Sequence, residues 1–459
     1  MNESAKVVVV GAGIAGLRAA GLLTDALGAD NVLVLEASEL PGGTARTDSV
    51  DGFICDRGTN GFLDKEPRTL QWADELGLTD SLIRADEAAA HRFILRNDRL
   101  VEVVGPPGFF FAPLLSWRGK ARLACEPFVK RRTDPAPESI WDFAARRIGP
   151  EAADTLVSAM VLGVFGGDAK TLSLEHCFPV MAEMERDHGS LVKAMFARKR
   201  AGSSGGPAGP RGTLTSFDGG IGILCERAAQ KLGERLRLGH AVRTLEPRNG
   251  GWRLNCTNDV IVDTEQVILA SPAHRTAEIV KDCAPELSRA LATIEQASLA
   301  VVCTAYPIDA VGASLDGFGF LIPPNQKKRA LGCIWTSSVF PGFTKDGWVF
   351  LRTMVGGARD PEAVNLSDTE LLDVIHRDIH PVMKIDTDPG FVRIYRHPRG
   401  IPQYGLSHGS VLDAVDATEA QHPGLAFAGN AYRGVSMNDC IVSAHRATER
   451  ILSSSPTAT

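Results

Sequence analysis

Several common features are scarce or missing in this 459-residue sequence, and each absence excludes a class of protein. The nine cysteines are odd in number and none forms a C-x-x-C pair, which argues against a disulfide framework or a zinc site and favours a reducing compartment. Lys and Arg total 49 against 55 Asp and Glu, so no overall positive field recruits nucleic acid. No run reaches the roughly 18 uncharged apolar residues that span a bilayer.

The apolar N-terminus, VVVVGAGIAGLRAAGLL, does not have the pattern of a signal peptide. It contains Arg18 and three ordered glycines, which fit a strand, a turn and a helix better. The residue pattern predicts a buried strand over 6–10, a helix over 14–26 and a second strand over 31–36. Together these form one βαβ unit.

The turn of this unit carries the glycine fingerprint of a dinucleotide site. Gly11 permits the tight turn, Gly13 lets the backbone approach a pyrophosphate, and Gly16 lets the helix pack closely on the strand. Glu36 ends the second strand, where an acidic side chain accepts hydrogen bonds from ribose hydroxyls and disfavours a 2′-phosphate. The alternative is that the three glycines serve only to pack a βα turn, and it does not explain the acidic residue Glu36.

The residues after Glu36 favour FAD over NAD. NAD dehydrogenases usually follow the second strand with a helix, whereas here LPGGTARTDSVDGFICDRGTNG follows, with Gly42, Gly43 and Arg46 and then Gly58. Such a glycine pair with an arginine resembles flavoproteins of the FAD-dependent amine oxidase superfamily. The C-terminal FAGNAYRGVSMND resembles the second flavin-contact motif of that superfamily, in which a turn delivers a helix N-terminus to the flavin.

Nearly end to end, the chain resembles the bacterial protoporphyrinogen oxidase family. The similarity rests on DRGTNGFLDKEP, HRFILRNDRL, LGVFGGDAKTLSLEHCFP, MERDHGSL, TSFDGG, DGFGFLIP, GIPQY and GNAYRGVSMNDCI. It implies an α/β fold: a Rossmann-like FAD-binding domain of the amine oxidase/p-hydroxybenzoate hydroxylase type, an interleaved α+β substrate domain and a helical membrane-facing subdomain. The expected boundaries are 1–88, 212–290 and 398–459 for the FAD domain, 291–397 for the substrate domain, 89–200 for the helical subdomain and 201–211 for a flexible loop.

The resemblance also implies flavin contacts along the chain. They fall at Gly11, Gly13, Ile14, Ala15, Gly16, Glu36, Ala37, Gly42, Gly43, Arg46, Gly58, Thr59, Asn60, Val242, Ala270, Gly429, Asn430, Val435 and Ser436. No metal is expected.

For the substrate, the resemblance assigns six residues. Arg92 would pair with a propionate, as suits a guanidinium fork, and Gly163 would present its carbonyl to the macrocycle. Asn60 would lie near the flavin, and the apolar walls would come from Phe320, Leu321 and Trp335. Core packing or surface exposure is the alternative for each of the six.

The implied reaction is the oxidation of protoporphyrinogen IX to protoporphyrin IX, with six electrons passing as hydrides to flavin N5 and oxygen giving hydrogen peroxide. Two departures from the family, the stretch Gly58–Phe62 and the size of Trp335, leave room for coproporphyrinogen III. A flavin amine oxidase is a further alternative, although only four tyrosines are present to build its aromatic cage. A flavoprotein that carries porphyrin without turnover is another.

The segment GFFFAPLLSWRGK, residues 108–120, combines three phenylalanines with a basic edge. Three consecutive aromatics cannot all face one side of a helix or strand, so at least one should be exposed. In the resembled family the helical subdomain faces the membrane, which predicts a cytoplasmic protein that docks peripherally on the cytoplasmic membrane. Packing within the subdomain is the alternative. The partners implied are a tetrapyrrole, lipid and no nucleic acid, with a homodimer left open.

Overall fold

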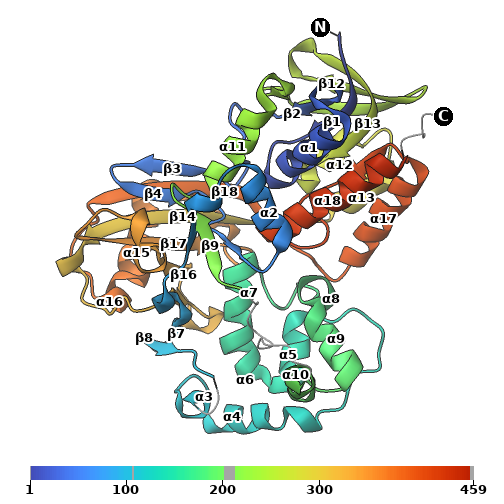
Figure 1. Ribbon diagram of the computed structural model, residues 1–459. Helices are drawn as coiled ribbons and strands as arrows, with labels where there is room; N and C mark the ends of the chain where they lie inside the picture. Colours follow the sequence, from blue (N-terminus) through green and yellow to red (C-terminus); the bar gives the residue numbers. More distant parts are fainter. Residues whose placement is uncertain (1, 106–107, 201–211, 455–459) are drawn as a thin grey trace.

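Figure 1 shows the computed structural model, which describes residues 2–105, 108–200 and 212–454. The loop expected at 201–211 lies outside the described residues. Among the residues that are described, no helix has both the length and the apolar character needed to cross a membrane.

The first large sheet has a parallel core with an antiparallel extension. Its order is β10-β2-β1-β13-β12-β11, and β19 also pairs with β13. The parallel strands are β10 (Leu236–Arg237), β2 (Val32–Leu35), β1 (Asn2–Val10), β13 (Ile261–Leu269) and β19 (Leu425–Phe427). The antiparallel strands are β12 (Gly251–Cys256) and β11 (Val242–Arg248). The predicted strand–helix–strand unit at the N-terminus is therefore confirmed, because β1 and β2 flank the helix α1 (Ile14–Leu27) and pair in parallel.

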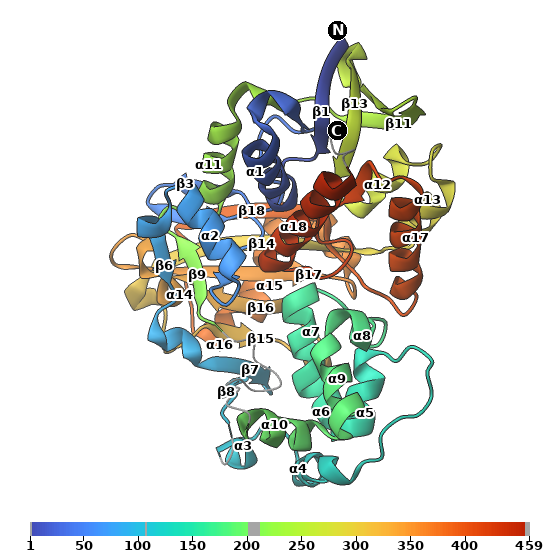
Figure 2. The ribbon, with the colours of Figure 1, turned by 45° about the vertical axis from the view of Figure 1, so that its right-hand side comes forward.

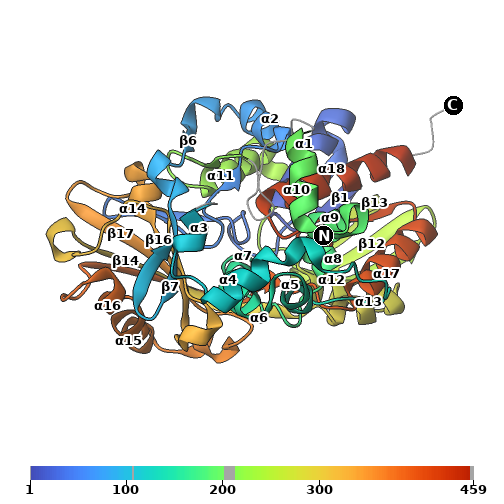
Figure 3. The same ribbon diagram turned by 90° about the horizontal axis from the view of Figure 1, so that it is seen from below.

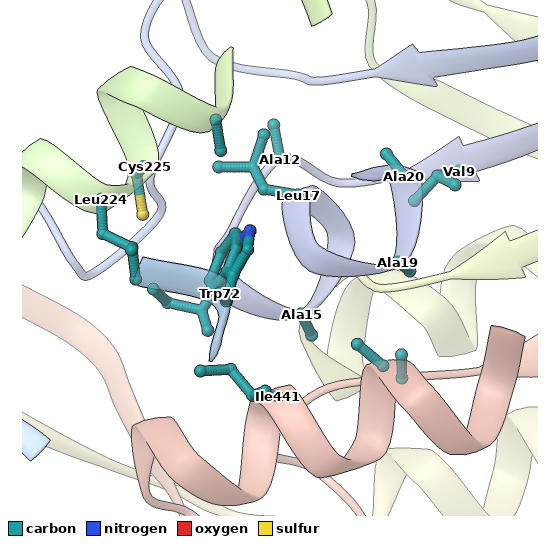
Figure 4. Packing of buried hydrophobic residues seen from close by; sticks show 14 of the residues in the cluster. Val9, Ala12, Ala15, Leu17, Ala19, Ala20, Trp72, Leu224, Cys225 and Ile441 are labelled. Atoms are coloured by element: carbon teal, nitrogen blue, oxygen red, sulfur yellow. The ribbon is translucent and has the colours of Figure 1, made fainter. Parts of the chain in front are cut away.

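Helices cover both faces of this sheet, which explains the continuous apolar runs of β1 and β2. On one face lie α1, α2 (Pro67–Glu75), α11 (Gly222–Leu232) and α18 (Met437–Ser454). On the other face lie α12 (Ala273–Ile279), α13 (Pro285–Ala292) and α17 (His408–Gln421). Figure 4 shows Trp72 of α2 filling the first core between Leu224 of α11 and Ile441 of α18.

The second large sheet is mostly antiparallel and lies beside the first, as Figure 2 shows. Its order is β18 (Phe391–Pro402), β14 (Gln296–Pro307), β17 (Trp348–Gly356), β16 (Ala330–Trp335), β15 (Gly319–Leu321), β7 (Arg92–Arg96) and β8 (Arg99–Glu102). Only β15 and β7 pair in parallel. One face of the sheet packs on α15 (Asp368–Asp378) and α16 (His380–Met383). The opposite face is directed toward the rest of the molecule.

The third part is helical and lies at the end of the molecule opposite both chain termini (Figure 1). It consists of α3 (Gly108–Phe111), α4 (Trp117–Ala124), α5 (Ile140–Ile148), α6 (Pro150–Ala152), α7 (Ser158–Phe165), α8 (Leu174–Cys177), α9 (Pro179–His188) and α10 (Leu191–Arg200). The strands β7 and β8, which fall inside the expected helical range of 89–200, join the second sheet instead. The exact division into domains stays a prediction.

Two small sheets complete the fold. One pairs β3 (Thr47–Val50) with β4 (Phe53–Asp56), and the other is β5 (Phe62–Leu63), β9 (Leu214–Phe217) and β6 (Leu82–Arg84). They carry the chain from the first sheet toward the second. The segment Asp56–Asn60 between them therefore lies where the two large sheets approach each other.

Candidate active site

Four neighbouring parallel strands of the first sheet end at one edge. Their last residues form one row: Leu35, Val10, Leu269 and Phe427. Each is followed within two residues by a predicted cofactor contact: Glu36, Gly11, Ala270 and Gly429. Four contacts that are far apart in sequence thus meet at the carboxyl edge of a parallel sheet, which is where such sheets bind ligands.

The glycine loop has the conformation that its sequence predicts. Gly11 has φ +104°, and a Cβ there would lie 2.9 Å from the carbonyl oxygen of Ala270. A Cβ on Gly16 would lie 1.8 Å from the carbonyl oxygen of Gly11, so only glycine allows the helix to start this close to the strand. At Gly13, by contrast, a Cβ would meet no protein atom within 4 Å. The space before the N-terminus of α1 is open at the position where the pyrophosphate is expected.

A second glycine loop closes over this space. Gly42 donates its N–H to the carbonyl oxygen of Ala12 at 2.7 Å, and Gly42 and Gly43 both have positive φ. A Cβ on Gly43 would lie 3.5 Å from the Cα of Gly13, so the two loops face each other without side chains. Arg46 donates Nε to the carbonyl oxygen of Pro41 at 2.9 Å, and burial with the nearby Arg57 lowers the pKa of its guanidinium. These residues fit a bound dinucleotide.

Glu36 is held in place by the same loop. Its Oε2 accepts the Ala12 N–H at 2.6 Å, and its Oε1 accepts the Ser38 N–H at 2.9 Å. The carboxylate thus lies between the glycine loop and the end of β2, and its remaining lone pairs are available to ribose hydroxyls.

The segment Asp56–Asn60 is fixed from the second sheet. Arg352 of β17 donates Nε to the carbonyl oxygen of Asp56 at 3.3 Å and a terminal nitrogen to that of Gly58. His397 of β18 donates Nε2 to the carbonyl oxygen of Arg57 at 2.8 Å, and burial lowers the pKa of this histidine. Both donors lie more than 290 residues along the chain from this segment.

Asp56 itself is a buried acid. Its Oδ1 accepts hydrogen bonds from Thr47 Oγ1 at 2.6 Å and from the Ile221 N–H at 3.1 Å. Burial raises the pKa of this carboxyl to about 6, and the hydrogen bonds and the charge of Arg352 only partly oppose that rise.

The turn after β19 begins at the same carboxyl edge of the first sheet and leads into α18. Gly429 has φ +120° and open space at its Cβ position, and its N–H donates to Ser443 Oγ at 3.1 Å. Ser436 and Asp439 cap the N-terminus of α18, because Ser436 N–H donates to the Asp439 carboxylate at 3.0 Å and Asp439 N–H to Ser436 Oγ at 3.2 Å. The N-terminus of α18 is thus capped, and a short turn connects it to the end of β19.

The predicted substrate residues collect on one face of the second sheet. One row of directly paired residues crosses β7, β15, β16 and β17: Arg92, Gly319, Ile334 and Arg352. Directly paired residues share a face, and so does Leu321, which follows Gly319 by two positions. Asn60 joins them, because it lines a small pocket together with Ile334 and Arg352.

Gly163 of α7 lies against this face. A Cβ there would come within 2.7 Å of a methyl group of Leu321, so a larger residue would require the Leu321 side chain to move. The glycine therefore permits close packing between α7 and β15. The structure brings Arg92, Asn60, Gly163 and Leu321 to one side of the sheet.

Arg92 is the cation of this face. Arg92 is exposed to solvent, and desolvation by the surrounding protein lowers the pKa of its guanidinium. Its guanidinium carbon lies 5.3 Å from the centre of the Phe318 ring. Among the described residues, no carboxylate lies within ion-pair distance of Arg92.

Phe320 and Trp335 lie on the opposite face. Both are nearly inaccessible to solvent and belong to the core beneath α15, where Trp335 contacts the Phe93 ring at 5.4 Å between centroids. Because strand residues alternate, Phe320 and its neighbour Leu321 cannot both line one pocket. Their burial agrees with the alternative of core packing, and a role of Phe320 or Trp335 beside the substrate stays a prediction.

The remaining predicted contacts lie in several different parts of the fold. Ile14 and Ala15 are buried in the first turn of α1, and Ala37 is exposed directly after Glu36. Val242 begins β11, and Val435 packs beside α7. Thr59 is half-buried in the segment held by Arg352.

The sequence patterns alone do not indicate a role for Arg352 or His397. A signal for Arg352 was present, since it is the one charged residue inside the apolar strand WVFLRTMVG. The partners of both residues are backbone carbonyls of a distant loop, which no local pattern indicates. Among the described residues, no cluster of His, Cys, Asp and Glu could hold a metal ion.

Comparison with known proteins agrees with this architecture. Residues 14–452 match the family described as flavin containing amine oxidoreductase. The chain is 29% identical to a coproporphyrinogen III oxidase of Bacillus subtilis, over 96% of this chain and 97% of the relative. It is also 29% identical to a mitochondrial protoporphyrinogen oxidase of Nicotiana tabacum, over 98% of this chain and 95% of that relative. A crystal structure from Exiguobacterium sp. 255-15, assigned as a protoporphyrinogen oxidase, superposes with a TM-score of 0.83 at 24% identity, over 97% and 98% of the two chains.

Proposed function

The chain belongs to the family of flavin-containing amine oxidoreductases and is an FAD-dependent oxidase, and we propose that its substrate is a porphyrinogen. The leading candidate is protoporphyrinogen IX, oxidised to protoporphyrin IX with oxygen as acceptor and hydrogen peroxide as product. Coproporphyrinogen III is the second candidate, because relatives of similar identity carry either name.

The observation that carries this proposal is the face shared by Arg92, Gly163 and Leu321. It offers a guanidinium that pairs with no described carboxylate, beside a place where α7 closely approaches Leu321 of β15. A guanidinium pairs well with a propionate, and an apolar surface suits the flat-edged macrocycle of a porphyrinogen. The residues here bind and orient the substrate, which is already electron-rich.

The cofactor would lie along the carboxyl edge of the first sheet. The two glycine loops would hold its pyrophosphate, Glu36 its ribose and the N-terminus of α18 its ring. Bound FAD supplies the hydride acceptor that no side chain provides. Arg352 and His397 hold the segment Asp56–Asn60 in place between that ring and the substrate face.

The four tyrosines of the chain argue against an amine oxidase. Three of them, Tyr306, Tyr404 and Tyr432, are almost completely buried, and Tyr395 donates its hydroxyl to Asp48 at 2.8 Å. None lies in the row of Arg92 and Arg352. Tyr395 of β18 shares this face of the sheet, but its hydroxyl is engaged with Asp48, so the face carries a single tyrosine and no pair that could form an aromatic cage among the described residues.

One assay tests the proposal. Purified holoenzyme is mixed with protoporphyrinogen IX, with coproporphyrinogen III and with a polyamine, and porphyrin fluorescence and peroxide are followed. Porphyrin formation from either porphyrinogen above the rate of autoxidation supports the proposal, and the ratio of the two rates identifies the substrate. Turnover of the amine alone contradicts it. Bound flavin that neither porphyrinogen bleaches under anaerobic conditions indicates a carrier instead.

Arg92→Ala tests the role of the cation. Loss of one charge-assisted pair should raise KM by about tenfold or more while flavin content stays at the wild-type level. Arg99→Ala is the matched control, since Arg99 lies exposed on the neighbouring strand of the same hairpin. Equal effects of the two variants, or loss of flavin with Arg92→Ala, would assign Arg92 a role in folding.

We propose further that the helical part docks peripherally on a membrane. Phe111 and Trp117 are 80% and 75% exposed, which confirms that one of the three phenylalanines lies outside the core. Leu114 and Leu115, by contrast, are buried. Phe128 and Phe196 add further exposed aromatic area on η4 (Glu126–Phe128) and α10, elements that contact each other.

Cations accompany these aromatics. Arg118 and Lys130 are exposed, whereas Lys120, which lies 4.6 Å from the centre of the Trp117 ring, is buried. Arg122 and Arg132 are engaged instead with the Arg147 carbonyl oxygen and with Asp134. Exposed aromatics with a few cations suit an anionic lipid surface.

Flotation with vesicles of phosphatidylglycerol and phosphatidylcholine tests the docking. The variant Phe111→Ser/Trp117→Ser should lower binding by about tenfold or more, because it removes two large apolar side chains from the interface. Ile308→Ser is the control, since Ile308 is similarly exposed on η8 (Ile308–Ala310), which directly follows β14 and lies outside the helical part. Unchanged binding of the double variant would reject the membrane role.

A further inference from the structure

The turn between β19 and α18, residues Gly429–Ser436, has no regular secondary structure, yet its backbone is fixed by one buried side chain. We infer that Tyr404 is a positioning residue that sets the shape of this turn and thereby the affinity and potential of the flavin. The inference rests on the proposed flavin site, of which this turn is one wall.

Tyr404 bridges two backbone groups of the turn through its hydroxyl. It donates to the carbonyl oxygen of Asn430 at 2.6 Å and accepts the N–H of Gly434 at 3.0 Å. These two groups lie four residues apart, so a single hydroxyl closes the turn in the way that a pair of backbone hydrogen bonds would. Gly434 has φ +121°, and a Cβ there would lie 2.3 Å from the Asp439 carboxyl carbon, so the backbone is confined from the other side as well.

The tyrosine ring is itself held rigidly. It stacks on the His408 ring with 4.0 Å between centroids and 18° between planes. His408 Nε2 lies 2.7 Å from the carbonyl oxygen of Tyr432, a further residue of the turn. Because a carbonyl oxygen only accepts, Nε2 carries the proton, and burial lowers the pKa of this histidine to about 4.

The backbone of Tyr404 is anchored to the helical part. Its carbonyl oxygen accepts the N–H of Ser173 at 2.8 Å, and the next residue, Gly405, forms a β-bridge with Leu172. The preceding residue, Gln403, donates to the carbonyl oxygen of Phe165 at the end of α7. Tyr404 thus connects α7, which carries Gly163, with the turn that leads into α18.

Burial makes the hydroxyl difficult to replace. Tyr404 is completely buried, and burial raises the pKa of its hydroxyl, so it keeps the proton that it donates to Asn430. Removing the oxygen would leave a carbonyl and an N–H of the turn without this partner. The turn would then open, and the N-terminus of α18 would lose its fixed distance from the flavin.

Tyr404→Phe tests the inference, with Tyr306→Phe as its matched control. Tyr306 is equally buried, and its hydroxyl lies 2.9 Å from His380 Nε2 in the core of the second sheet. Both variants delete one buried hydroxyl, so both should lower the melting temperature. Only Tyr404→Phe should weaken FAD binding, by about tenfold. It should also lower the flavin midpoint potential, because a displaced helix N-terminus stabilises the reduced ring less. The readouts are FAD titration of deflavinated protein and a redox titration with a reference dye.

Equal FAD affinity and potential in the two variants would overturn the inference. Gly13→Val separates that outcome from failure of the flavin site itself. If Gly13→Val abolishes FAD binding while Tyr404→Phe matches Tyr306→Phe, the flavin site stands and the positioning role is wrong. If Gly13→Val still binds FAD, the proposed flavin site is wrong, and the role of Tyr404 is overturned with it.

Discussion

The nucleotide edge of the first sheet and the helical part at residues 108–200 form their proposed functional surfaces in opposite ways. At the nucleotide edge the surface is backbone, and glycines at Gly13 and Gly43 keep side chains away from it. In the helical part the surface is side chain, and exposed aromatics such as Phe111 rest on a framework of buried charges. The first surface depends on local φ and ψ angles, and the second depends on long-range packing.

The largest expected effect comes from filling the open space at Gly13. The residue has φ −80° and ψ −176°, an extended conformation that valine adopts without strain. Gly13→Val should therefore leave the fold intact but place methyl groups where the pyrophosphate lies, which should weaken FAD binding by at least about 100-fold, or roughly 3 kcal/mol. Absorbance of the purified variant near 450 nm and a melting curve measure the two outcomes. A Gly13→Val variant that has normal stability and is still yellow, and therefore still binds FAD, would contradict the view that exposed backbone forms the cofactor surface.

The contrast between the two surfaces also decides how much the sequence could predict. Gly11, Gly13 and Gly16 act within one turn, and their spacing alone predicts the strand, the loop and the helix that the structure contains. Glu36 was predictable as well, because it ends the adjacent strand of the same βαβ unit.

The substrate face was only partly predictable, because it depends on which way each strand residue points. Leu321 and Phe320 are neighbours in sequence but lie on opposite faces of β15. Their assignment needed the register of β15 against β7 and β16, which no single sequence supplies. Arg352 and Tyr404 were missed for a related reason, since both act on backbone atoms of distant loops.

The next largest effect should come from the buried charges of the helical part. Arg147 is completely buried and pairs with Glu126, and it also donates to Glu185 at 3.2 Å and to the carbonyl oxygen of Gly189 at 3.1 Å. Burial opposes the charge of Glu126, but hydrogen bonds from Ser190, the Leu191 N–H and Arg147 outweigh it and keep the pKa of this carboxyl below its ordinary value. The pair therefore holds the start of α10 against η4.

Arg147→Ala should lower the unfolding free energy by about 3–5 kcal/mol, because it leaves Glu126 buried without its cation. Urea denaturation measures the loss, and limited proteolysis should locate it to the helical part while FAD affinity stays unchanged. Arg131→Ala, an exposed arginine of the same segment, should change stability by less than about 0.5 kcal/mol. Loss of FAD with Arg147→Ala at unchanged stability would show that the two surfaces are not independent.

A smaller, pH-dependent effect is expected at Asp56, between the two large sheets. Its pKa rises from 3.8 to about 6 on folding, so the native state holds a proton that the unfolded state has already lost between these pH values. The stability contributed by this proton is present below pH 3.8 and is lost as the pH rises through about 6, for a total of about 3 kcal/mol. Asp56→Asn cannot ionise, so its unfolding free energy relative to the wild type should rise by that amount between pH 3.5 and 7. If the unfolding free energies of the two proteins changed with pH in parallel, the pKa of Asp56 would not be raised by folding.

The smallest expected effect tests the interpretation of Gly13 directly. It uses a second glycine of α1 whose Cβ position has no neighbouring atoms. Gly21 of α1, like Gly13, has no atom within 4 Å of its Cβ position, but it lies in the helix interior, away from the carboxyl edge of the sheet. Gly21→Ala should therefore stabilise the protein by about 0.5–1 kcal/mol through helix propensity and leave FAD affinity unchanged. Thermal melts with and without excess FAD distinguish the two contributions. A fall in FAD affinity with Gly21→Ala would show that open space at a glycine of α1 does not by itself identify the cofactor surface, and the interpretation of Gly13 would lose its main support.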